Sequence, residues 1–368
     1  MHQGIYEEQI EKGKAWLPMD ARVLKCITAL LGLFTVFVCC CLYYFPGIHA
    51  REVLAVENQR QEEILPGEIM QTMAPEAVVK EEDLKAQLRV GLPPGLTKEQ
   101  LALENDYLTQ TVYVRFSEGV DDYFAEYGIR GSSDHIASLS YYKDGSTGVI
   151  ALGLDAVYEL EDFYEDGSLY LNFIDPHDIY DKVVVVDAGH GGRAPGAVKN
   201  GVSEKNIDLA ILLELKAVFE KEDGNTGVYY TRTSDTNPTL EQRVQLANKS
   251  RADLFISIHN NSSASGNFSM THGTQVMYSQ SDKSEFSSKR LARICLDSMV
   301  EALGSRDGGL LKGDDIYIIQ NSESPVALIE VGFMTNYEEL DKLKSADYQK
   351  KAAKGIYRAI QKAFEEGY

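Results

Sequence analysis

The sequence predicts an α/β fold for its C-terminal half, with a mixed, mainly parallel sheet of about six strands flanked by helices. Two observations predict it. From Lys182 onward, short apolar runs alternate with longer segments in which apolar residues recur every three or four positions. Several runs are continuously apolar, which is typical of strands that helices cover on both faces. A separate small, mainly-β domain and an N-terminal transmembrane helix are predicted before this half.

The composition limits the classes of partner. Of the 368 residues, 44% are hydrophobic, which is enough apolar material for two modest domains with tails. The chain carries 36 basic and 56 acidic side chains, a formal net charge of -20. A nucleic-acid surface would have to oppose this field, so we exclude nucleic acid as a partner. The charge also opposes attachment to an anionic wall or membrane surface, so another device must hold the protein in place.

A transmembrane anchor is predicted at residues 23–46, after a cytoplasmic tail at residues 1–22. About 20 uncharged, mostly apolar residues run from Cys26 to Phe45, enough for a helix to cross the hydrocarbon layer. A cleavable signal peptide is the alternative, but its apolar region is shorter and a small-residue cleavage site follows it. Basic residues are more frequent before the span than after it. We therefore expect a single-pass protein of the cell membrane with its N-terminus in the cytoplasm and its larger part outside.

The cysteines provide no disulfide framework for the exported part. Four of the five lie in or beside the predicted span. The run from Cys39 to Cys41 either fills apolar space there or carries acyl chains. Cys295 lies on the apolar face of a predicted helix, so we expect a buried structural thiol at this position.

Two segments precede the α/β domain. Residues 47–105 are rich in Glu, Gln, Lys and Ala, and we predict a stalk with helix at Glu81–Arg89 and Lys98–Asn105. Residues 106–181 contain short Tyr-, Val- and Leu-rich runs separated by turn dipeptides such as Asp-Gly. Such runs predict a small antiparallel β domain.

The α/β domain is predicted at residues 182–368. The expected strands carry the runs VVVVDAG, GVYYTR, DLFISIH, GTQVMYS, DIYIIQ and VALIEVG. The expected helices lie between or after them, at Glu204–Lys221, Leu240–Arg251, Lys283–Leu303 and Asp347–Glu366.

Polar residues appear where three of these strands end. His190 follows the first strand, His259 ends the third, and Glu330 lies near the end of the last. Ligands of open α/β sheets bind beyond the carboxyl ends of the strands, so these side chains can converge there with Glu204, which begins the first helix. Two histidines and one carboxylate form a catalytic zinc set with a fourth position open, and the second carboxylate, Glu330, is then free to act as a base.

Each of these residues also has a purely structural interpretation. A histidine that closes a strand is more often a loop or core residue than a ligand, and Glu204 alone would be a first-turn acid favoured by the helix dipole. Glu330 is different, because a carboxylate inside an apolar strand is costly to bury without a partner. His272 is a reserve ligand. Gly191-Gly192 indicates a tight turn, because no phosphate-binding Gly-Lys-Ser/Thr follows.

The C-terminal half resembles a known family over about half of the chain. The run VVVVDAGHGGRAPGAVKNGVSEKNIDLAILLELK, followed in order by YTRTSD, LEQRVQLANKSRADLFISIHNNSS, GTQVMYS and SPVALIEVGFMTN, resembles the zinc-dependent N-acetylmuramoyl-L-alanine amidases. The resemblance implies that His190, Glu204 and His259 bind Zn2+ and that Glu330 is the catalytic acid/base. It also implies hydrolysis of the amide bond between N-acetylmuramic acid and L-alanine in peptidoglycan.

Some features depart from the family or extend beyond it. Ala188 stands where members often have proline, and Ala194 stands where they often have an acid; neither change removes a ligand. The segment after His259 is too short for the self-inhibiting helix that some relatives insert. By placement and strand pattern, residues 106–181 resemble the AMIN-type wall-targeting domains that precede many amidases. Glycan binding and a spacer role both remain open for them.

Three other functions stay in view at this point. A zinc peptidase that cuts within the stem peptide would use the same four residues, because specificity depends on the shape of the cleft. A non-catalytic wall-binding or activator protein would predict a broken ligand set, whereas His190, Glu204, His259 and Glu330 are all present. A membrane scaffold that acts through its β domain would tolerate loss of Glu330. Asn260 and Asn261 either contact the peptide stem or form a turn.

Overall fold

The computed structural model describes residues 70–80, 84–222, 224–281 and 287–368. The predicted tail and anchor, residues 1–46, lie outside these ranges, as does most of the stalk up to residue 69. Within the described ranges, no helix is long and apolar enough to cross a membrane.

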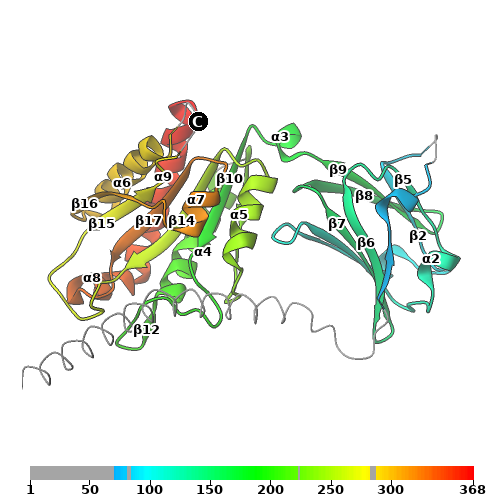
Figure 1. Cartoon of the computed structure of the whole chain (residues 1–368), viewed down its shortest axis with the longest axis horizontal. Coiled ribbons are helices and arrows are strands. Elements are labelled where there is room, and N and C mark those ends of the chain that lie inside the picture. Colours follow the sequence, from blue (N-terminus) through cyan, green and yellow to red (C-terminus); the bar gives the residue numbers. More distant parts are fainter. Residues whose placement is uncertain (1–69, 81–83, 223, 282–286) are drawn as a thin grey trace, which may run out of the picture. The chain divides into compact units, whose positions relative to one another are not determined.

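The first part of the described chain is a β sandwich of two antiparallel sheets (Figure 1). One sheet has the strand order β1-β6-β7-β4-β3 and the other has the order β5-β2-β9-β8. The short helices α2 (Tyr123–Glu126) and α3 (Pro176–Ile179) accompany it. The strands are β1 (Gln71–Met73), β2 (Leu88–Gly91), β3 (Leu101–Asp106), β4 (Thr111–Phe116), β5 (Ile129–Gly131), β6 (Ile136–Asp144), β7 (Thr147–Leu154), β8 (Glu159–Glu165) and β9 (Ser168–Ile174).

One apolar core lies between the two sheets. It joins residues such as Leu88 and Leu171 of one sheet to Val114 and Leu152 of the other, all without exposed surface. The described residues before the α/β part are mainly β, and their fold has the face-to-face packing of a sandwich.

The prediction of helices at Glu81–Arg89 and Lys98–Asn105 was wrong for most of the residues that the structure describes, because only Lys98–Gln100, one turn of 3-10 helix, is helical there. Leu88–Gly91 and Leu101–Asp106 are strands, not parts of helices, and both belong to the sandwich. The sequence LALEND consists mostly of good helix formers, but its pairing with β4 in six consecutive positions overrides that preference. The β region therefore begins well before residue 106.

The second part of the described chain is an α/β fold around a six-stranded sheet with the order β13-β10-β14-β17-β15-β16 (Figure 1). Neighbouring strands are parallel except β15 and β17, which are antiparallel, so the predicted mixed, mainly parallel sheet is confirmed. The strands, with the small β11-β12 hairpin, are β10 (Lys182–Ala188), β11 (Val198–Lys199), β12 (Val202–Ser203), β13 (Thr226–Tyr230), β14 (Leu254–Asn261), β15 (Thr274–Tyr278), β16 (Asp307–Lys312) and β17 (Val326–Phe333).

Helices cover both faces of this sheet. Along β10, Val184 and Val186 face a core shared with α4, α6 and α9, whereas Val183 and Val185 face a core shared with α5 and α7. Burial on both faces explains why these strands are continuously apolar. The helices are α4 (Glu204–Glu222), α5 (Leu240–Lys249), α6 (Ser288–Leu303), α7 (Tyr317–Asn321), α8 (Tyr337–Leu343) and α9 (Ala346–Glu365).

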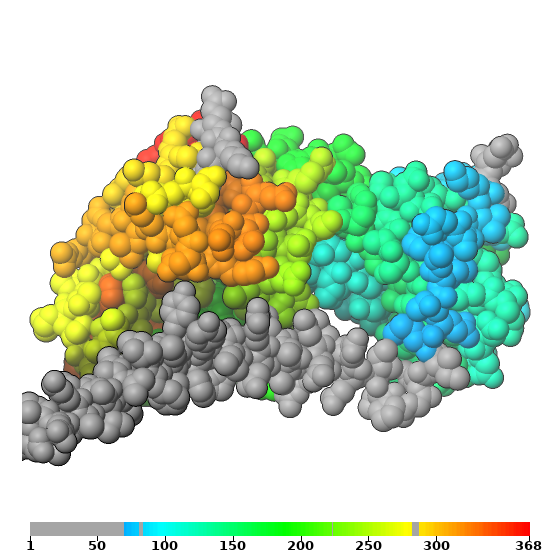
Figure 2. Space-filling model, viewed as in Figure 1, coloured from blue at the N-terminus to red at the C-terminus, as the bar shows by residue number. Residues whose placement is uncertain are grey.

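One predicted strand is a helix. The run DIYIIQ was predicted as a strand, but Tyr317–Asn321 forms α7, whose Ile318 and Ile319 are buried against the sheet. Figure 2 shows this part of the chain, in orange, at the surface of the α/β region. The strand is instead β16, in the segment DGGLLK, where two glycines conceal the strand pattern. A short apolar run does not distinguish a strand from a buried helix.

The prediction for Cys295 is confirmed. The thiol lies in α6 without exposed surface and within the core between α6 and the sheet. Burial raises its pKa to about 12, so this cysteine is an inert packing residue.

Candidate metal centre

The structure brings three of the predicted residues together at the carboxyl end of the sheet. One potential metal-ligating atom from each of His190, Glu204, Asp208 and His259 lies within 4.8 Å of the others. His190 follows β10, Glu204 and Asp208 lie in the first turns of α4, and His259 lies in β14. Residues up to 69 positions apart in the sequence thus meet at one edge, as the strand-end rule predicts.

Glu204 is the centre of this cluster. Its Oε1 lies 3.1 Å from His190 Nε2 and 3.0 Å from His259 Nδ1. Its Oε2 accepts a hydrogen bond from the backbone N–H of Ala197, at 2.8 Å, which fixes the direction of the carboxylate. Burial opposes ionisation of Glu204, but hydrogen bonds from the two histidines outweigh burial and lower the pKa of the carboxyl. Glu204 is therefore charged at neutral pH and could serve as a metal ligand.

Two glycines make room for the ligands. A Cβ atom on Gly189 would lie 2.3 to 2.6 Å from three ring atoms of His259. A Cβ on Gly196, which has a φ of +67°, would lie 2.5 Å from Glu204 Oε2 and 2.7 Å from His190 Cδ2. Any larger residue at either position would displace a ligand side chain, so the close approach of these side chains depends on glycine.

Glu330 is the neighbour of His259 in the sheet. The two residues are register partners in the parallel strands β14 and β17. Glu330 Oε2 is buried and has no hydrogen-bond partner among the described residues. Burial raises the pKa of Glu330 to about 7, against the opposing charge of His259. The pKa of His259 is itself raised to about 9, because hydrogen bonding to Glu204 and the nearby carboxylates outweigh its burial. A carboxyl with a pKa near neutrality can exchange protons at working pH.

Asp208 was not predicted from the sequence. It lies one helical turn after Glu204, has no exposed surface, and accepts a 2.7 Å hydrogen bond from the side-chain amide of Asn260. Its burial and the charge of Glu204 raise its pKa well above the usual value. The signal available in the sequence was the spacing of four residues from Glu204, which places both carboxylates on one face of α4.

The other polar candidates have structural roles. His272 is exposed, bonds to the backbone of Met270 at 2.9 Å, and is not part of the metal-ligating group, so the reserve ligand is not needed. Asn260 is buried and holds Asp208, and Asn261 donates to Gln275 within the sheet. Neither asparagine forms a turn, because both belong to β14.

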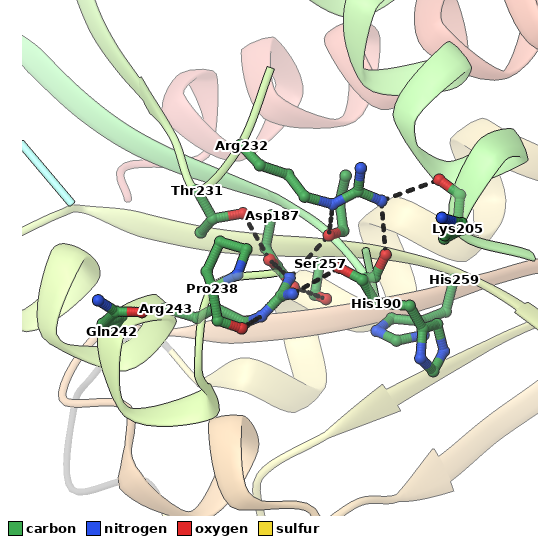
Figure 3. Close-up of polar contacts among 12 residues, drawn as sticks. Asp187, His190, Lys205, Thr231, Arg232, Pro238, Gln242, Arg243, Ser257 and His259 are labelled. Carbon is green, nitrogen blue, oxygen red and sulfur yellow. Dashed lines mark hydrogen bonds and ion pairs between the residues drawn. The ribbon is translucent and has the colours of Figure 1, made fainter. Parts of the chain in front are cut away.

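A buried polar network lies beneath the cluster (Figure 3). Asp187, the next-to-last residue of β10, accepts hydrogen bonds from Thr231 and Ser257, each at 2.6 Å, and pairs with Arg243. Burial opposes its ionisation, but Arg243 and the hydroxyl groups outweigh burial and lower its pKa. The strand that leads to His190 therefore ends in a fixed, charged anchor.

Comparison with known proteins shows which family has this arrangement. Residues 184–362 match the N-acetylmuramoyl-L-alanine amidase family. The uncharacterized protein YqiI of Bacillus subtilis is 40% identical over 185 residues, which are 50% of this chain and 86% of that protein. The germination-specific N-acetylmuramoyl-L-alanine amidase of Bacillus subtilis is 32% identical over 199 residues, which cover 50% of this chain and 81% of that enzyme. The chain belongs to the N-acetylmuramoyl-L-alanine amidase family.

The amidase match accounts for the α/β region. A similar solved structure is the catalytic domain of CwlV, an N-acetylmuramoyl-L-alanine amidase from Bacillus (Paenibacillus) polymyxa var. colistinus. It is 34% identical, with a TM-score of 0.46, and the match covers 50% of this chain and 98% of that one. The amidase is a peptidoglycan hydrolase that cleaves the bond between N-acetylmuramic acid and L-alanine. The family match leaves the β sandwich outside, because it begins at residue 184.

Proposed function

We propose that this amidase is a zinc enzyme in which His190, Glu204 and His259 bind the metal and Glu330 is the catalytic acid/base. The observation that carries the proposal is the convergence of both histidine nitrogens on Glu204 Oε1, at 3.0 and 3.1 Å. Ligand atoms about 2.0 to 2.2 Å from a tetrahedral zinc ion are separated by roughly 3.3 Å, close to the separations found here. Two imidazole nitrogens and one carboxylate oxygen are also a donor set that zinc favours.

Zinc held by these ligands would polarise the scissile carbonyl and lower the pKa of water at the site. Glu330 supplies the proton transfer. Its unpartnered Oε2 accepts the proton of the attacking water as the water oxygen bonds to the carbonyl carbon. The same oxygen returns that proton to the nitrogen of L-alanine as the C–N bond breaks, so that a lactyl carboxyl group and a free amine are formed. A pKa near 7 suits both transfers, because the group must gain and lose a proton in each cycle.

Digestion of purified peptidoglycan by the full-length protein tests this proposal. Mass analysis should find free stem peptides that begin at L-alanine, lost with a chelator and restored by zinc. Fragments cut within the stem peptide would instead support the peptidase alternative. Intact muropeptides under all conditions, from protein shown to be folded, would support a binding or activator role.

We also propose that residues 23–46 anchor the enzyme in the cell membrane, with the catalytic region on the outer side. The apolar length of this segment and the excess of basic residues before it support this orientation. A protease added to intact cells whose wall has been removed should then degrade the region after residue 46 and protect the tail at residues 1–22. Recovery of the whole chain in the soluble fraction would contradict the proposal.

A further inference from the structure

The backbone conformation of the turn that carries His190 is intrinsically unfavourable and needs support from its surroundings. His190 has a φ of +58°, in the left-handed region that residues other than glycine rarely adopt. This conformation costs on the order of 1 kcal/mol, and it persists only when the surroundings determine it. The hydrogen bonds that fix the turn are therefore part of the site.

Arg243 of α5 holds the turn from one side. Its Nη2 donates to the carbonyl oxygen of His190 at 2.6 Å, and its Nη1 donates to the carbonyl oxygen of Ala188 at 2.7 Å. The same Nη1 pairs with Asp187, and Nε donates to the carbonyl oxygen of Pro238 at 3.1 Å. One guanidinium group thus fixes the end of β10 and the backbone of a ligand (Figure 3).

Arg232 holds the turn from the other side and links it to α4. Its Nε donates to the carbonyl oxygen of Ala188 at 2.9 Å. Its Nη2 donates both to the carbonyl oxygen of Gly189, at 2.7 Å, and to that of Lys205, at 2.9 Å. Lys205 directly follows Glu204, so this nitrogen joins the backbone segments that carry two of the three proposed ligands (Figure 3).

Burial of these two charged side chains costs desolvation free energy. Each is only 3% exposed. Every hydrogen bond that the structure gives to Arg232 ends on a backbone carbonyl, so no carboxylate among the described residues pairs with this buried charge. Apolar residues would stabilise an interior at least as well as buried charges. What apolar residues cannot supply is a planar fork of donors aimed at several carbonyl oxygens at once.

We propose that Arg232 and Arg243 are positioning residues that set the placement of His190 relative to Glu204 and thereby the geometry of the bound metal. This inference rests on the proposed zinc site. Lysine cannot replace either residue, because its single ammonium group cannot reach the separate carbonyl oxygens that each guanidinium group contacts. Partners of this kind, one step removed from the metal, typically change metal affinity by about 10- to 100-fold when they are replaced.

The test uses full-length Arg232→Lys and Arg243→Lys variants loaded with cobalt(II) as well as zinc. The absorption spectrum of cobalt(II) reports coordination geometry independently of activity. Both variants should bind zinc about 10- to 100-fold more weakly and show an altered cobalt spectrum. In both, the fold decrease in kcat should be larger than the fold increase in KM. The matched control is Ser257→Ala, which removes a hydrogen bond to Asp187 from the same buried network but touches no carbonyl of the turn. It should lower thermal stability and leave zinc affinity and the cobalt spectrum unchanged.

Three results would overturn this inference alone, and a fourth would overturn it together with the proposed function. Wild-type spectra and zinc affinity in both lysine variants would overturn it. An equal loss of affinity in the Ser257 variant would also overturn it, by showing that the network acts only through stability. If a lysine variant unfolds, sucrose can restore its fold, and a wild-type cobalt spectrum in the refolded variant would again contradict positioning. If the wild-type protein itself binds no zinc, the proposed function fails and this inference fails with it, whereas zinc binding by the wild type with unchanged lysine variants overturns this inference alone.

Discussion

His259 and Glu330 occupy paired positions in the adjacent parallel strands β14 and β17, so the proposed zinc ligand and the proposed acid/base stand next to each other in the sheet. The two side chains differ in their hydrogen bonds. His259 is bonded to Glu204, whereas the Oε2 of Glu330 has no partner in the described structure. Four predictions follow from this arrangement and from the packing around it.

The first prediction concerns Glu330. Glu330→Gln should retain stoichiometric zinc but reduce kcat by roughly 100- to 10,000-fold, because the amide cannot accept the proton of water. Metal analysis and turnover of purified muropeptides measure the two effects. Glu323→Gln, an exposed substitution shortly before the same strand, is the control and should behave as wild type. Substantial turnover by the Glu330 variant would remove this residue from its proposed role.

The second prediction concerns pH and stability in the metal-free protein. The folded-state pKa of Glu330 is raised to about 7 from 4.5, so the native state binds more protons than the unfolded state between these values. Stability should therefore decrease as pH rises from 4.5 to 7, by roughly 3 kcal/mol from this one group. Glu330→Gln should be clearly more stable than wild type at pH 8 and show little difference at pH 4.5. Thermal unfolding of both proteins after chelation, at a series of pH values, measures the difference in stability. Equal pH profiles of stability for the two proteins would contradict the prediction.

The third prediction concerns the choice of histidine. His259→Ala should lose high-affinity zinc binding and activity together, because it removes one of the three proposed zinc ligands. His272→Ala should keep both, since this exposed side chain is outside the metal-ligating group. Zinc titration of the two variants compares them directly. Weaker binding only in the His272 variant would show that the ligand set is assigned wrongly.

The fourth prediction concerns space at the site. Gly189→Ala should weaken zinc binding at least tenfold, because its Cβ would meet the ring of His259 at 2.3 to 2.6 Å and must displace it. Gly224→Ala is the matched control, since a Cβ there has no atom within 4 Å. Zinc affinity and circular dichroism of both variants test this. Unchanged affinity in a folded Gly189 variant would mean that the ring can move without loss.

Much of the α/β fold could be predicted because its strands are continuously apolar and its main helices have a clear period. The convergence of His190, Glu204 and His259 could be predicted because two of them stand at the ends of strands and the third begins the next helix, and such positions meet at the carboxyl edge of an open sheet. The order of strands could not be predicted. It depends on which strands pair across long sequence distances, and the run LALEND, with good helix formers, became a strand only through such pairing.

The supporting residues of the site were missed because they resemble ordinary surface positions. Arg243 lies in LEQRVQLANK, where a charged residue would normally face solvent, and only the tertiary structure turns it inward. Asp208 could have been found from its spacing to Glu204, but a second acid on a helix is common without any function. Buried hydrogen-bonding partners of this kind leave little trace in a single sequence.

The strand order has a consequence for how activity arises. β17 is the last strand along the described chain, yet it stands in the interior of the sheet, between β14 and β15. During synthesis the chain can supply His190, Glu204 and His259 long before it supplies Glu330. A growing or interrupted chain therefore lacks the proposed acid/base, and on that proposal the capacity to cut the cell wall appears only when the sheet receives β17.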